Sequence, residues 1–345
     1  MFKPRFKVSP KLNNLLVKIA VDADKIVNLG ILPKRELGLM RSARLRMIHS
    51  STAIEGNPLG IRDVEAVLAG KVVTGINQKD RLEVVNYEKA MQYIDKIVKG
   101  NIADWEKVVL EIHRLTTKDL LASKESGCYR IGPVFIVQRP SNKVLYRAPL
   151  ASKVKKLMKE FYSWLKSKEA GELSPVIVAA VAHHQLVTIH PFIDGNGRTA
   201  RILATLVLYD RGYDIKKTFA LEDYYNLKRQ AYYKAIQKAR KRNDLTSWLE
   251  YFSQGFLVEL NNVLEKVDHF AVEMKTKKEP IYLSKRQRDI LDFVAINGKI
   301  FRSDVVDIVT VSPKTAYREL EFLRQNDLLL RKGRGPSSHY ILKKG

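Results

Sequence analysis

This sequence of 345 residues contains a single cysteine, Cys128, and lacks both a low-complexity tract and any long apolar run. One cysteine excludes disulfides within the chain and favours a reducing compartment, so we expect a cytoplasmic protein. No stretch is apolar for long enough to cross a membrane, and the first residues lack the apolar core of a secretory signal. At this length we expect two or three domains, each with its own buried core.

Acidic residues are also scarce relative to basic ones, and the formal net charge is +24. Such an excess suits a polyanionic partner. Residues 281–345 contain 13 Lys/Arg and 7 Asp/Glu, which is only slightly more positive than an even spread of the charge would give. The composition therefore marks no dedicated basic domain, and part of the charge is accounted for by ordinary surface solvation.

One segment combines residue types that suit work on a polyphosphate. Residues 190–201 read HPFIDGNGRTAR. His190 can act as a base near neutral pH, and the carboxylate of Asp194 is a ligand that suits Mg²⁺. A lone histidine is more often structural than catalytic, so the interpretation depends on its neighbours.

Those neighbours favour anion binding. Gly195 and Gly197 allow a tight turn with N–H groups facing an anion, whereas a Gly-Asn-Gly by itself is usually a plain turn. We expect a helix that starts at about Arg198, so that Arg198 and Arg201 lie on one face and bind phosphate oxygens together. An apolar stretch precedes the segment and Pro191 ends that helix at His190, which predicts a helix, an anion loop and a second helix.

The segment resembles the signature of Fic-domain proteins, HxFx(D/E)GNGRxxR, at every defined position. In that family a target hydroxyl attacks the α-phosphate of ATP, AMP is transferred to the target and pyrophosphate leaves. The resemblance implies that His190 deprotonates the hydroxyl, that Phe192 anchors the loop in the core and that Asp194 binds Mg²⁺.

The same resemblance assigns the ATP phosphates to the rest of the signature. Gly195, Asn196 and Gly197 correspond to the anion-binding turn, and Arg198 and Arg201 correspond to ligands of the β- and γ-phosphates. The intact GNGR argues against the family branch that transfers the γ-phosphoryl group, whose loop departs at these glycines.

A second motif, STAIEG, occupies residues 51–56 and is similar to the inhibitory helix of the family, (S/T)xxxE(G/N). A helix-compatible stretch precedes it, and Gly56-Asn57-Pro58 ends that helix. The pattern alone is also typical of any helix that ends in Glu-Gly. Beside the signature, the resemblance implies that Ser51 and Glu55 restrain the enzyme, with Glu55 paired to Arg201, as in the class II arrangement.

Between the two motifs, residues 129–150 predict a β-hairpin with its turn at Pro140-Ser141-Asn142. An ordinary surface hairpin would give the same pattern. The resemblance implies a flap that holds the target by strand addition, through Val134, Phe135, Ile136 and Val137.

Further along, the segment LKRQAYYKAI resembles a helix at the adenine end of the site, where Lys228 and Tyr232 are the expected ATP contacts. The family often has Asn where this chain has Lys228, so the details of base recognition differ.

The end of the chain predicts a separate module. After a charged linker, Ser284 begins one helix, a short helix follows, Ser312 and Pro313 begin a third, and a hairpin with a Gly-rich tip closes the chain. This order resembles a winged helix-turn-helix. The resemblance implies DNA contacts by Lys314, Arg318 and Arg334, although many such modules bind protein or dimerise instead.

These features predict a mainly α protein: an N-terminal helical region with the inhibitory helix (1–79), a Fic core with a β-hairpin flap (80–265), a linker (266–283) and a winged helix (284–345). We expect a protein adenylyltransferase that uses ATP and Mg²⁺, modifies a protein hydroxyl, including its own, forms a homodimer and has no membrane contact.

Two alternatives stay open. One is a hydrolase that removes AMP, with Glu55 orienting water, and the other is a DNA-binding regulator whose Fic core senses nucleotide. The complete catalytic set, with His190, argues against mere sensing. A metal hydrolase built on His183, His184 and His190 lacks a recognised ligand spacing.

Overall fold

The structure is a computed structural model that describes residues 2–28, 33–98, 102–138, 143–273, 283–333 and 335–343. It is mainly helical, as expected. The helices and strands are α1 (Pro10–Asn28), α2 (Pro33–Ile54), α3 (Ile61–Leu68), α4 (Gln78–Ile97), α5 (Trp105–Thr117), β1 (Phe135–Gln138), β2 (Lys143–Arg147), α6 (Ala151–Leu165), α7 (Lys168–Glu172), α8 (Pro175–Ile189), α9 (Asn196–Asp210), η1 (Ile215–Lys217), α10 (Leu221–Leu227), α11 (Arg229–Arg242), α12 (Thr246–Glu273), α13 (Lys285–Asn297), α14 (Arg302–Val309), α15 (Pro313–Gln325), β3 (Leu329–Lys332), η3 (Gly335–Ser337) and β4 (His339–Leu342).

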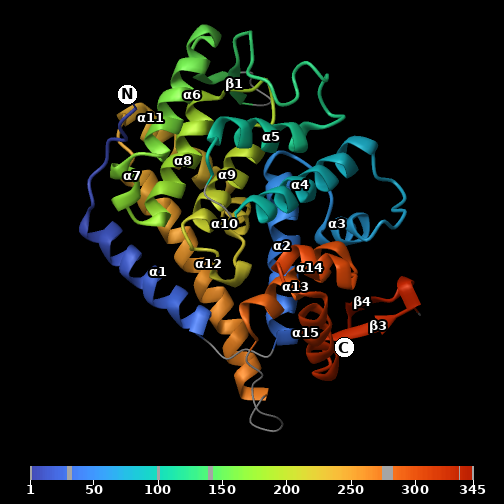
Figure 1. Ribbon diagram of the computed structural model, residues 1–345. Helices are drawn as coiled ribbons and strands as arrows, with labels where there is room; N and C mark the ends of the chain where they lie inside the picture. The colour runs from blue at the N-terminus through green and yellow to red at the C-terminus, as the bar shows by residue number, and fades with distance from the viewer. Residues whose placement is uncertain are drawn as a thin grey trace.

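Helix α8 is the centre of the larger body (Figure 1). It is apolar around its whole circumference, as a helix enclosed on all sides must be, and nearly every side chain in it is buried. Its partners are α9, α12 and α6, while α5 covers another side of α9. The α8–α9 pair therefore holds the loop between them, residues 190–195, at the edge of a rigid core.

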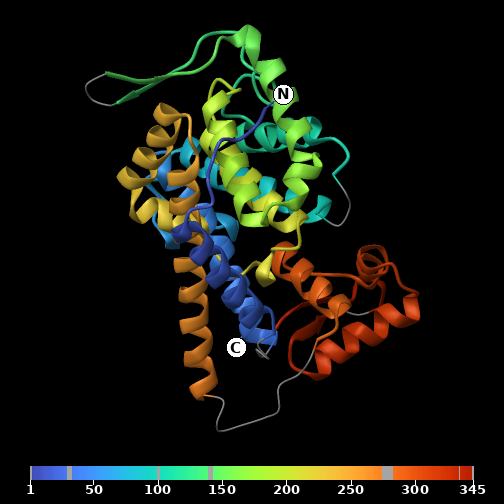
Figure 2. The same ribbon diagram turned by 90° about the vertical axis from the view of Figure 1, so that its left-hand side faces the viewer.

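The N-terminal helices belong to this same core. One cluster of buried apolar side chains extends from Leu12 to Val267, so the described residues before residue 80 form no separate core. Helix α1 packs along α12, and α2 contacts α3, α4, α9 and α10 (Figures 1 and 2). The end of α2 is thereby fixed beside the start of α9.

The C-terminal elements form a second body with its own apolar cluster. Three helices and a hairpin follow each other in the predicted order, and Ser284 and Ser312 cap α13 and α15 as expected. Strands β3 and β4 pair antiparallel, and Ile300 pairs with Tyr340 of β4. Leu37 of α2 is buried in this cluster, so α2 spans both bodies.

The predicted hairpin is formed by β1 and β2, which pair antiparallel with an irregularity between Ile136 and Val137. It projects away from the helical body as a long green arm in Figure 2. Its expected turn at Pro140-Ser141-Asn142 lies outside the described residues. Within the described ranges, no helix has both the length and the apolarity to cross a membrane.

Candidate active site

His190 lies where α8 ends, at the position that the sequence predicts. Its backbone is left-handed (φ 52°, ψ 58°) and its N–H closes the helix on the carbonyl of Leu186 at 2.8 Å. This conformation is uncommon for a residue other than glycine, and it turns the chain sharply into the loop. The catalytic candidate is therefore held in a fixed place by the end of a buried helix.

The ring of His190 is arranged as a base. Its Nδ1 lies 3.2 Å from the carbonyl oxygen of Val187, and a carbonyl can only accept, so Nδ1 carries the proton. Nε2 then has a free lone pair. Burial, with smaller contributions from the nearby Arg240 and Arg130, lowers the pKa of His190 to about 4, so the ring is neutral at pH 7.

The loop after His190 is held by hydrogen bonds between the Asn196 side chain and the backbone of the loop itself. The Asn196 side chain accepts from the N–H of Phe192 at 3.0 Å and donates to the carbonyl of Phe192 at 2.9 Å. Phe192 is fully buried, as expected, and stacks on His113 with ring centroids 3.7 Å apart. Asn196 thus shapes the turn with its side chain.

His113 of α5 is a site residue that the sequence analysis did not identify. It receives the N–H of Gly127 on Nδ1 at 2.9 Å, so Nε2 carries the proton and donates to the carbonyl of Asp194 at 3.0 Å. Burial lowers the pKa of His113 to about 4, which keeps it neutral. It fastens the anion loop to α5.

Both glycines of the turn are required by close contacts. Gly195 has φ 76°, and a Cβ there would lie 2.8 Å from Cγ2 of Thr117. A Cβ on Gly197 would lie 2.2 Å from Oε1 of Glu55. Helix α9 begins at Asn196, two residues before the expected start, because Gly195 takes the N-cap position. The free N–H groups of its first turn are available to an anion.

Arg198 is buried beside this turn, with only 4% of its side chain exposed. Its Nη2 lies 3.3 Å from Asp194, and its Nη1 lies 3.5 Å from the carboxylate of Glu83. Nε and Nη1 find no hydrogen-bond acceptor within the part of the chain that the structure describes. A buried guanidinium with unmet donors is suited to a phosphate group.

Arg201 is held by the end of α2. Its Nη2 donates to Oε1 of Glu55 at 2.8 Å and to the carbonyl of Ser51 at 2.9 Å, while Nε donates to the Ser51 hydroxyl at 2.7 Å. The predicted contact between Glu55 and Arg201 is present. Arg201 is 1% exposed and Glu55 is 32% exposed, so a fixed cation meets an accessible carboxylate.

Further buried groups surround Arg201. Tyr87 donates to Glu222 at 3.2 Å and lies beside Ser51, and the Tyr232 hydroxyl is 2.9 Å from Nε2 of His183. Burial raises the pKa of Glu222 to about 7, although the charge of Arg201 opposes this. Burial alone lowers the pKa of Arg201, but Glu55 and the neighbouring tyrosines more than reverse that shift.

Residues 104–208 match the sequence profile of the Fic/DOC family, a range that holds α5, α8, the anion loop and most of α9. The chain contains a Fic domain.

Curated relatives of this Fic domain are named protein adenylyltransferase Fic. That of Nematostella vectensis is 32% identical over 237 residues, which are 66% of this chain and 53% of the relative. That of Aedes aegypti is 34% identical over 175 residues, 50% of this chain and 34% of the relative. The chain therefore spans about half or less of the length of these relatives.

Solved structures share the fold. A Fic family protein from Desulfovibrio desulfuricans has a TM-score of 0.68 and 24% identity, and the match covers 100% of this chain and 99% of that one. Fic-1 from C. elegans (residues 134–508) has a TM-score of 0.61 and 23% identity over 75% of this chain and 73% of that one.

Arg130 links the segments that flank the β1–β2 hairpin to His190, and the sequence analysis missed it. Its guanidinium donates to three carbonyls, those of His190 at 2.7 Å, Gly132 at 2.8 Å and Pro149 at 2.5 Å. Its own N–H donates to Pro191 at 2.9 Å. No local pattern identifies such a residue, because its furthest partner, Pro191, is 61 positions away.

The two expected adenine contacts are placed differently from each other. Lys228 is exposed and lies over the ring of Tyr224, 4.8 Å from its centroid. Tyr232 is buried against Arg201 and His183. Its neighbour Tyr233 is exposed and donates to the carbonyl of Ile54 at 3.3 Å, so it is the tyrosine at the surface of the site.

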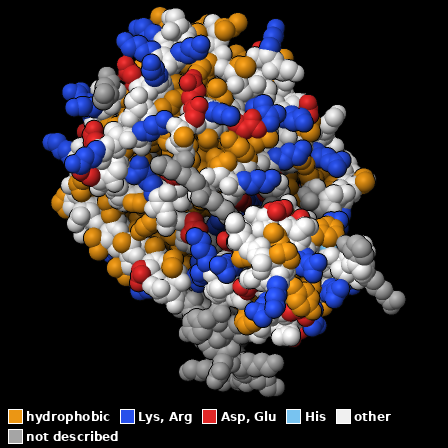
Figure 3. All heavy atoms as spheres, viewed as in Figure 1, with side chains coloured by type: hydrophobic (Ala, Val, Ile, Leu, Met, Phe, Trp, Pro, Cys, Tyr) orange, Lys and Arg blue, Asp and Glu red, His pale blue; other side chains and the backbone are white. Residues whose placement is uncertain are grey.

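The remaining site predictions lie at the periphery. Phe135, Ile136 and Val137 are in strand β1, and Val134 directly precedes it. Val137 pairs with Val144 of β2. Lys314 and Arg318 are exposed on α15, and Arg334 lies outside the described residues. Figure 3 shows Lys and Arg side chains scattered over one face of the molecule and interspersed with acidic ones.

Proposed function

We propose that this chain transfers AMP from ATP to a hydroxyl group of a protein. The single observation that carries the proposal is the placement of a neutral histidine, with Nε2 free, beside a glycine turn and two buried arginines. The names of the curated relatives support the same reaction. His190→Ala tested with ATP labelled at the α-phosphate is the experiment that decides it.

In the proposed reaction the target hydroxyl gives its proton to Nε2 of His190 and its oxygen forms a bond to the α-phosphorus. The bond from that phosphorus to the bridging oxygen breaks, and pyrophosphate leaves. The N-terminus of α9, Arg198 and Arg201 would hold the β- and γ-phosphates, where negative charge accumulates. These groups are preorganised by burial, so they need little rearrangement during the reaction.

Asp194 is the residue that fits a magnesium ion. Its side chain is 66% exposed at the loop, and within the described residues its carboxylate pairs with Arg198 alone. Mg²⁺ commonly uses one or two protein carboxylates together with substrate phosphates and water, so a single acidic ligand is sufficient. When bound, the ion would neutralise phosphate charge, and this chain's own contribution is to hold Asp194 through the His113 contact to its carbonyl.

We further propose that Glu55 restrains the enzyme. Its carboxylate occupies Arg201 and lies against Gly197, where a phosphate would otherwise sit. ATP can bind productively only after this carboxylate leaves. Ser51 holds the other side of Arg201 and keeps the guanidinium in place for either anion.

A second candidate function is the removal of AMP from a modified protein. Glu55 is one third exposed, so its carboxylate is accessible to a water molecule as well as to Arg201. Glu55→Gly discriminates between the two functions. Loss of restraint increases AMP transfer, whereas loss of a water-orienting base decreases AMP release from a modified target.

The C-terminal body is proposed to be a winged helix that binds DNA through Lys314 and Arg318 on α15, together with Arg334, which lies outside the described residues. Exposed cations on the third helix support this use. Counterion release predicts that affinity falls steeply with salt. Full-length protein and the double variant Lys314→Gln/Arg318→Gln should be compared on one duplex at low and moderate salt. Equal binding by both would favour a protein partner instead.

The partner and location predictions are part of the same proposal. The projecting β1–β2 hairpin would hold the target segment by strand addition. Homodimer formation and self-modification follow from the resemblance, and the cytoplasmic location follows from the single cysteine.

A further inference from the structure

A small cavity of about 160 Å³, here called the N-terminal cavity, lies where the first residues of the chain meet the last turns of α8 and α11. The backbone N–H of Leu245 donates to the carbonyl of Arg5 at 2.7 Å and holds the first residues there. Strand β2 contributes Tyr146 to the wall, and no residue of the segment 190–201 lines the cavity. It is smaller than the about 300–1,000 Å³ typical of sites for drug-sized ligands, so it suits a small molecule or a single functional group.

Every charged side chain that lines the N-terminal cavity is basic. Lys3, Arg5 and Arg240 contribute three positive charges, and the lining contains no carboxylate. None of the three forms an ion pair with another described residue. His184 also lines the cavity but adds no charge, because burial and the nearby Arg240 lower its pKa to about 3. The lining therefore presents uncompensated positive charge to a ligand.

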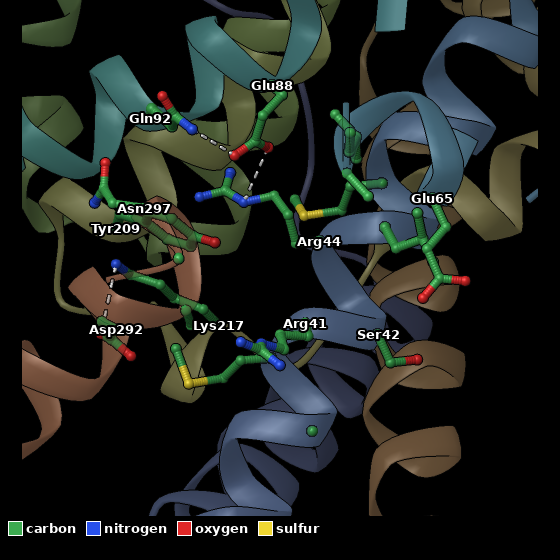
Figure 4. A pocket seen from close by; sticks show the side chains of 18 residues that line it. Arg41, Ser42, Arg44, Glu65, Glu88, Gln92, Tyr209, Lys217, Asp292 and Asn297 are labelled. Atoms are coloured by element: carbon green, nitrogen blue, oxygen red, sulfur yellow. Dashed lines mark hydrogen bonds and ion pairs between the residues drawn. The ribbon is translucent and has the colours of Figure 1, made fainter. Parts of the chain in front are cut away.

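A larger cavity, of about 780 Å³ between α2, the α3–α4 region and α13, shows the contrast. Its lining holds three cations and three carboxylates: Arg41, Arg44, Lys217, Glu65, Glu88 and Asp292. Figure 4 shows two of these cations paired, Arg44 with Glu88 and Lys217 with Asp292. That lining selects neither sign of charge, whereas the lining of the N-terminal cavity favours an anion.

Arg240 is fixed in the wall of the N-terminal cavity without an acidic partner. Its Nε donates to the hydroxyl of Thr188 at 3.1 Å, and its Nη2 donates to the carbonyl of Val187. Its guanidinium lies 4.0 Å from the ring centroid of Tyr146. Nη1 forms no hydrogen bond with a described residue and, unlike Nη1 of Arg44, it is not enclosed away from solvent. One donor of a fixed guanidinium is thus available to a ligand.

The environment of Arg240 differs from that of Arg201 in the missing carboxylate. Burial lowers the pKa of Arg240 to about 10, and the neighbouring tyrosines only partly oppose this. Burial acts in the same direction on the pKa of Arg201, but the carboxylate of Glu55 more than reverses it. An anion beside Arg240 would supply the partner that the described residues do not provide.

Two neutral amides add hydrogen-bonding capacity to the same wall. The side chains of Gln185 on α8 and Asn243 at the end of α11 line the N-terminal cavity and form no hydrogen bond with a described residue. Asn243 closes α11 in a left-handed conformation (φ 48°). Guanidinium and amide N–H groups together suit the several acceptor oxygens of a phosphate.

We propose that the N-terminal cavity binds a phosphate group, carried by free inorganic phosphate or by a small phosphate monoester. Nη1 of Arg240 would bind an oxygen from the fixed wall, and Arg5 and Lys3 would cover the group from the N-terminal segment. A phosphate monoester carries about 1.5–2 negative charges at neutral pH, so it matches three cations better than a carboxylate does. Binding here is independent of AMP transfer, so it can be tested even if His190 proves inactive.

The test is calorimetric titration of the full-length protein with inorganic phosphate, with methyl phosphate and with acetate, all at one ionic strength. The anion loop is itself a proposed phosphate site, and the variants separate the two sites. Arg5→Gln and Arg240→Gln change the N-terminal cavity and leave residues 190–201 unaltered. Arg5→Lys keeps the charge, and Arg242→Gln is the matched control, because Arg242 is exposed on α11 and does not line the cavity.

The side chain of Arg5 has no partner among the described residues, so Arg5→Gln should keep the melting temperature of the wild type. This variant keeps the test valid even if Arg240→Gln loses stability together with its bonds to Val187 and Thr188.

The proposal predicts that at least one phosphate compound binds more tightly than acetate. Arg5→Gln and Arg240→Gln should each weaken this binding about tenfold, the loss expected for one charged hydrogen bond. Arg5→Lys and Arg242→Gln should bind within a few-fold of wild type. The ratio of the two phosphate affinities distinguishes free phosphate from a monoester. Equal affinity for acetate, no binding of either phosphate compound, or unchanged affinity in Arg5→Gln would overturn the proposal, and the last result would assign the phosphate to the anion loop.

Discussion

Replacing Glu55 by glycine should convert a restrained Fic domain into an active one. Glu55 directly follows the last residue of α2, and its carboxylate bonds to Arg201 at 2.8 Å while lying against Gly197. The γ-phosphate of ATP would need the same guanidinium. The variant therefore removes the proposed competitor for that position and leaves the proposed phosphate ligands intact.

The size of the effect follows from that one bond. A hydrogen bond between charged groups contributes about 1.5–3 kcal/mol. If ATP must displace it, removal should increase the apparent affinity for productively bound ATP by about 10- to 150-fold. Arg201 keeps both of its bonds to Ser51, so stability should fall by less than the about 3–5 kcal/mol that is typical when a buried pair is broken.

The assay is incorporation of label from the α-phosphate of ATP into the protein itself and into a lysate, over a range of ATP concentrations. Glu55→Gln serves as the matched control, because it keeps the side chain's size and loses its charge, and it should show an intermediate gain. Adding Arg201→Ala to Glu55→Gly should remove the gain, since the freed guanidinium is what the phosphate requires.

An unchanged rate in Glu55→Gly, measured on folded protein, would refute the competition argument. A gain that persists in Glu55→Gly/Arg201→Ala would refute it as well, because the effect would then not pass through Arg201. A lower rate of AMP release from a modified target would instead favour the hydrolase.

Four other outcomes are expected. His190→Ala should lower AMP transfer by about 10²- to 10⁴-fold with ATP affinity largely kept, and a normal rate would exclude His190 as the base. The rate of AMP transfer should not fall as the pH is lowered through 6.5, because the pKa of His190 is lowered to about 4. A fall in the rate with a midpoint at pH 6.5 would contradict the burial of this ring. His113 and His184, 0% and 4% exposed, have their pKa values lowered to about 4 and about 3. Each neutral ring stabilises the folded protein at pH values above its unfolded-state pKa of about 6.5, and this stabilisation decreases by about 2 kcal/mol by pH 5. The urea concentration at the midpoint of unfolding should therefore fall between pH 7 and pH 5. A midpoint that does not change with pH would count against neutral buried rings. Arg130→Gln should lower kcat by about 10²-fold through displacement of His190, with little change in ATP affinity; equal losses in both would indicate general unfolding.

The centre of the site could be predicted from the sequence because local rules govern it. Pro191 ends α8 before the loop, Gly195 takes a left-handed conformation, and Phe192 is the apolar anchor of the segment. The start of α9 was placed two residues late, at Arg198, because the bonds between Asn196 and the backbone of Phe192 cannot be read from a helix pattern.

The supporting residues could not be predicted, because long-range packing determines them. His113 and Arg130 come from segments far from the motif, and neither stands in a spacing that signals a function. The resemblance implies that Tyr232 contacts the nucleotide, which stays a prediction; long-range packing of α11 buries Tyr232 beside Arg201 and His183 and exposes its neighbour Tyr233, a difference that no local pattern indicates. The division at residue 80 also has no counterpart in the core, because buried residues of α1 and α12 pack together.

The most direct test of AMP transfer compares two labels in one experiment. Glu55→Gly is incubated with ATP labelled either at the α-phosphate or at the γ-phosphate, and the modified proteins are analysed by mass. The proposed reaction predicts incorporation from the α-phosphate only, a mass gain of one AMP unit, and loss of both when His190→Ala is added. Incorporation from the γ-phosphate, or α-label that survives His190→Ala, would contradict it.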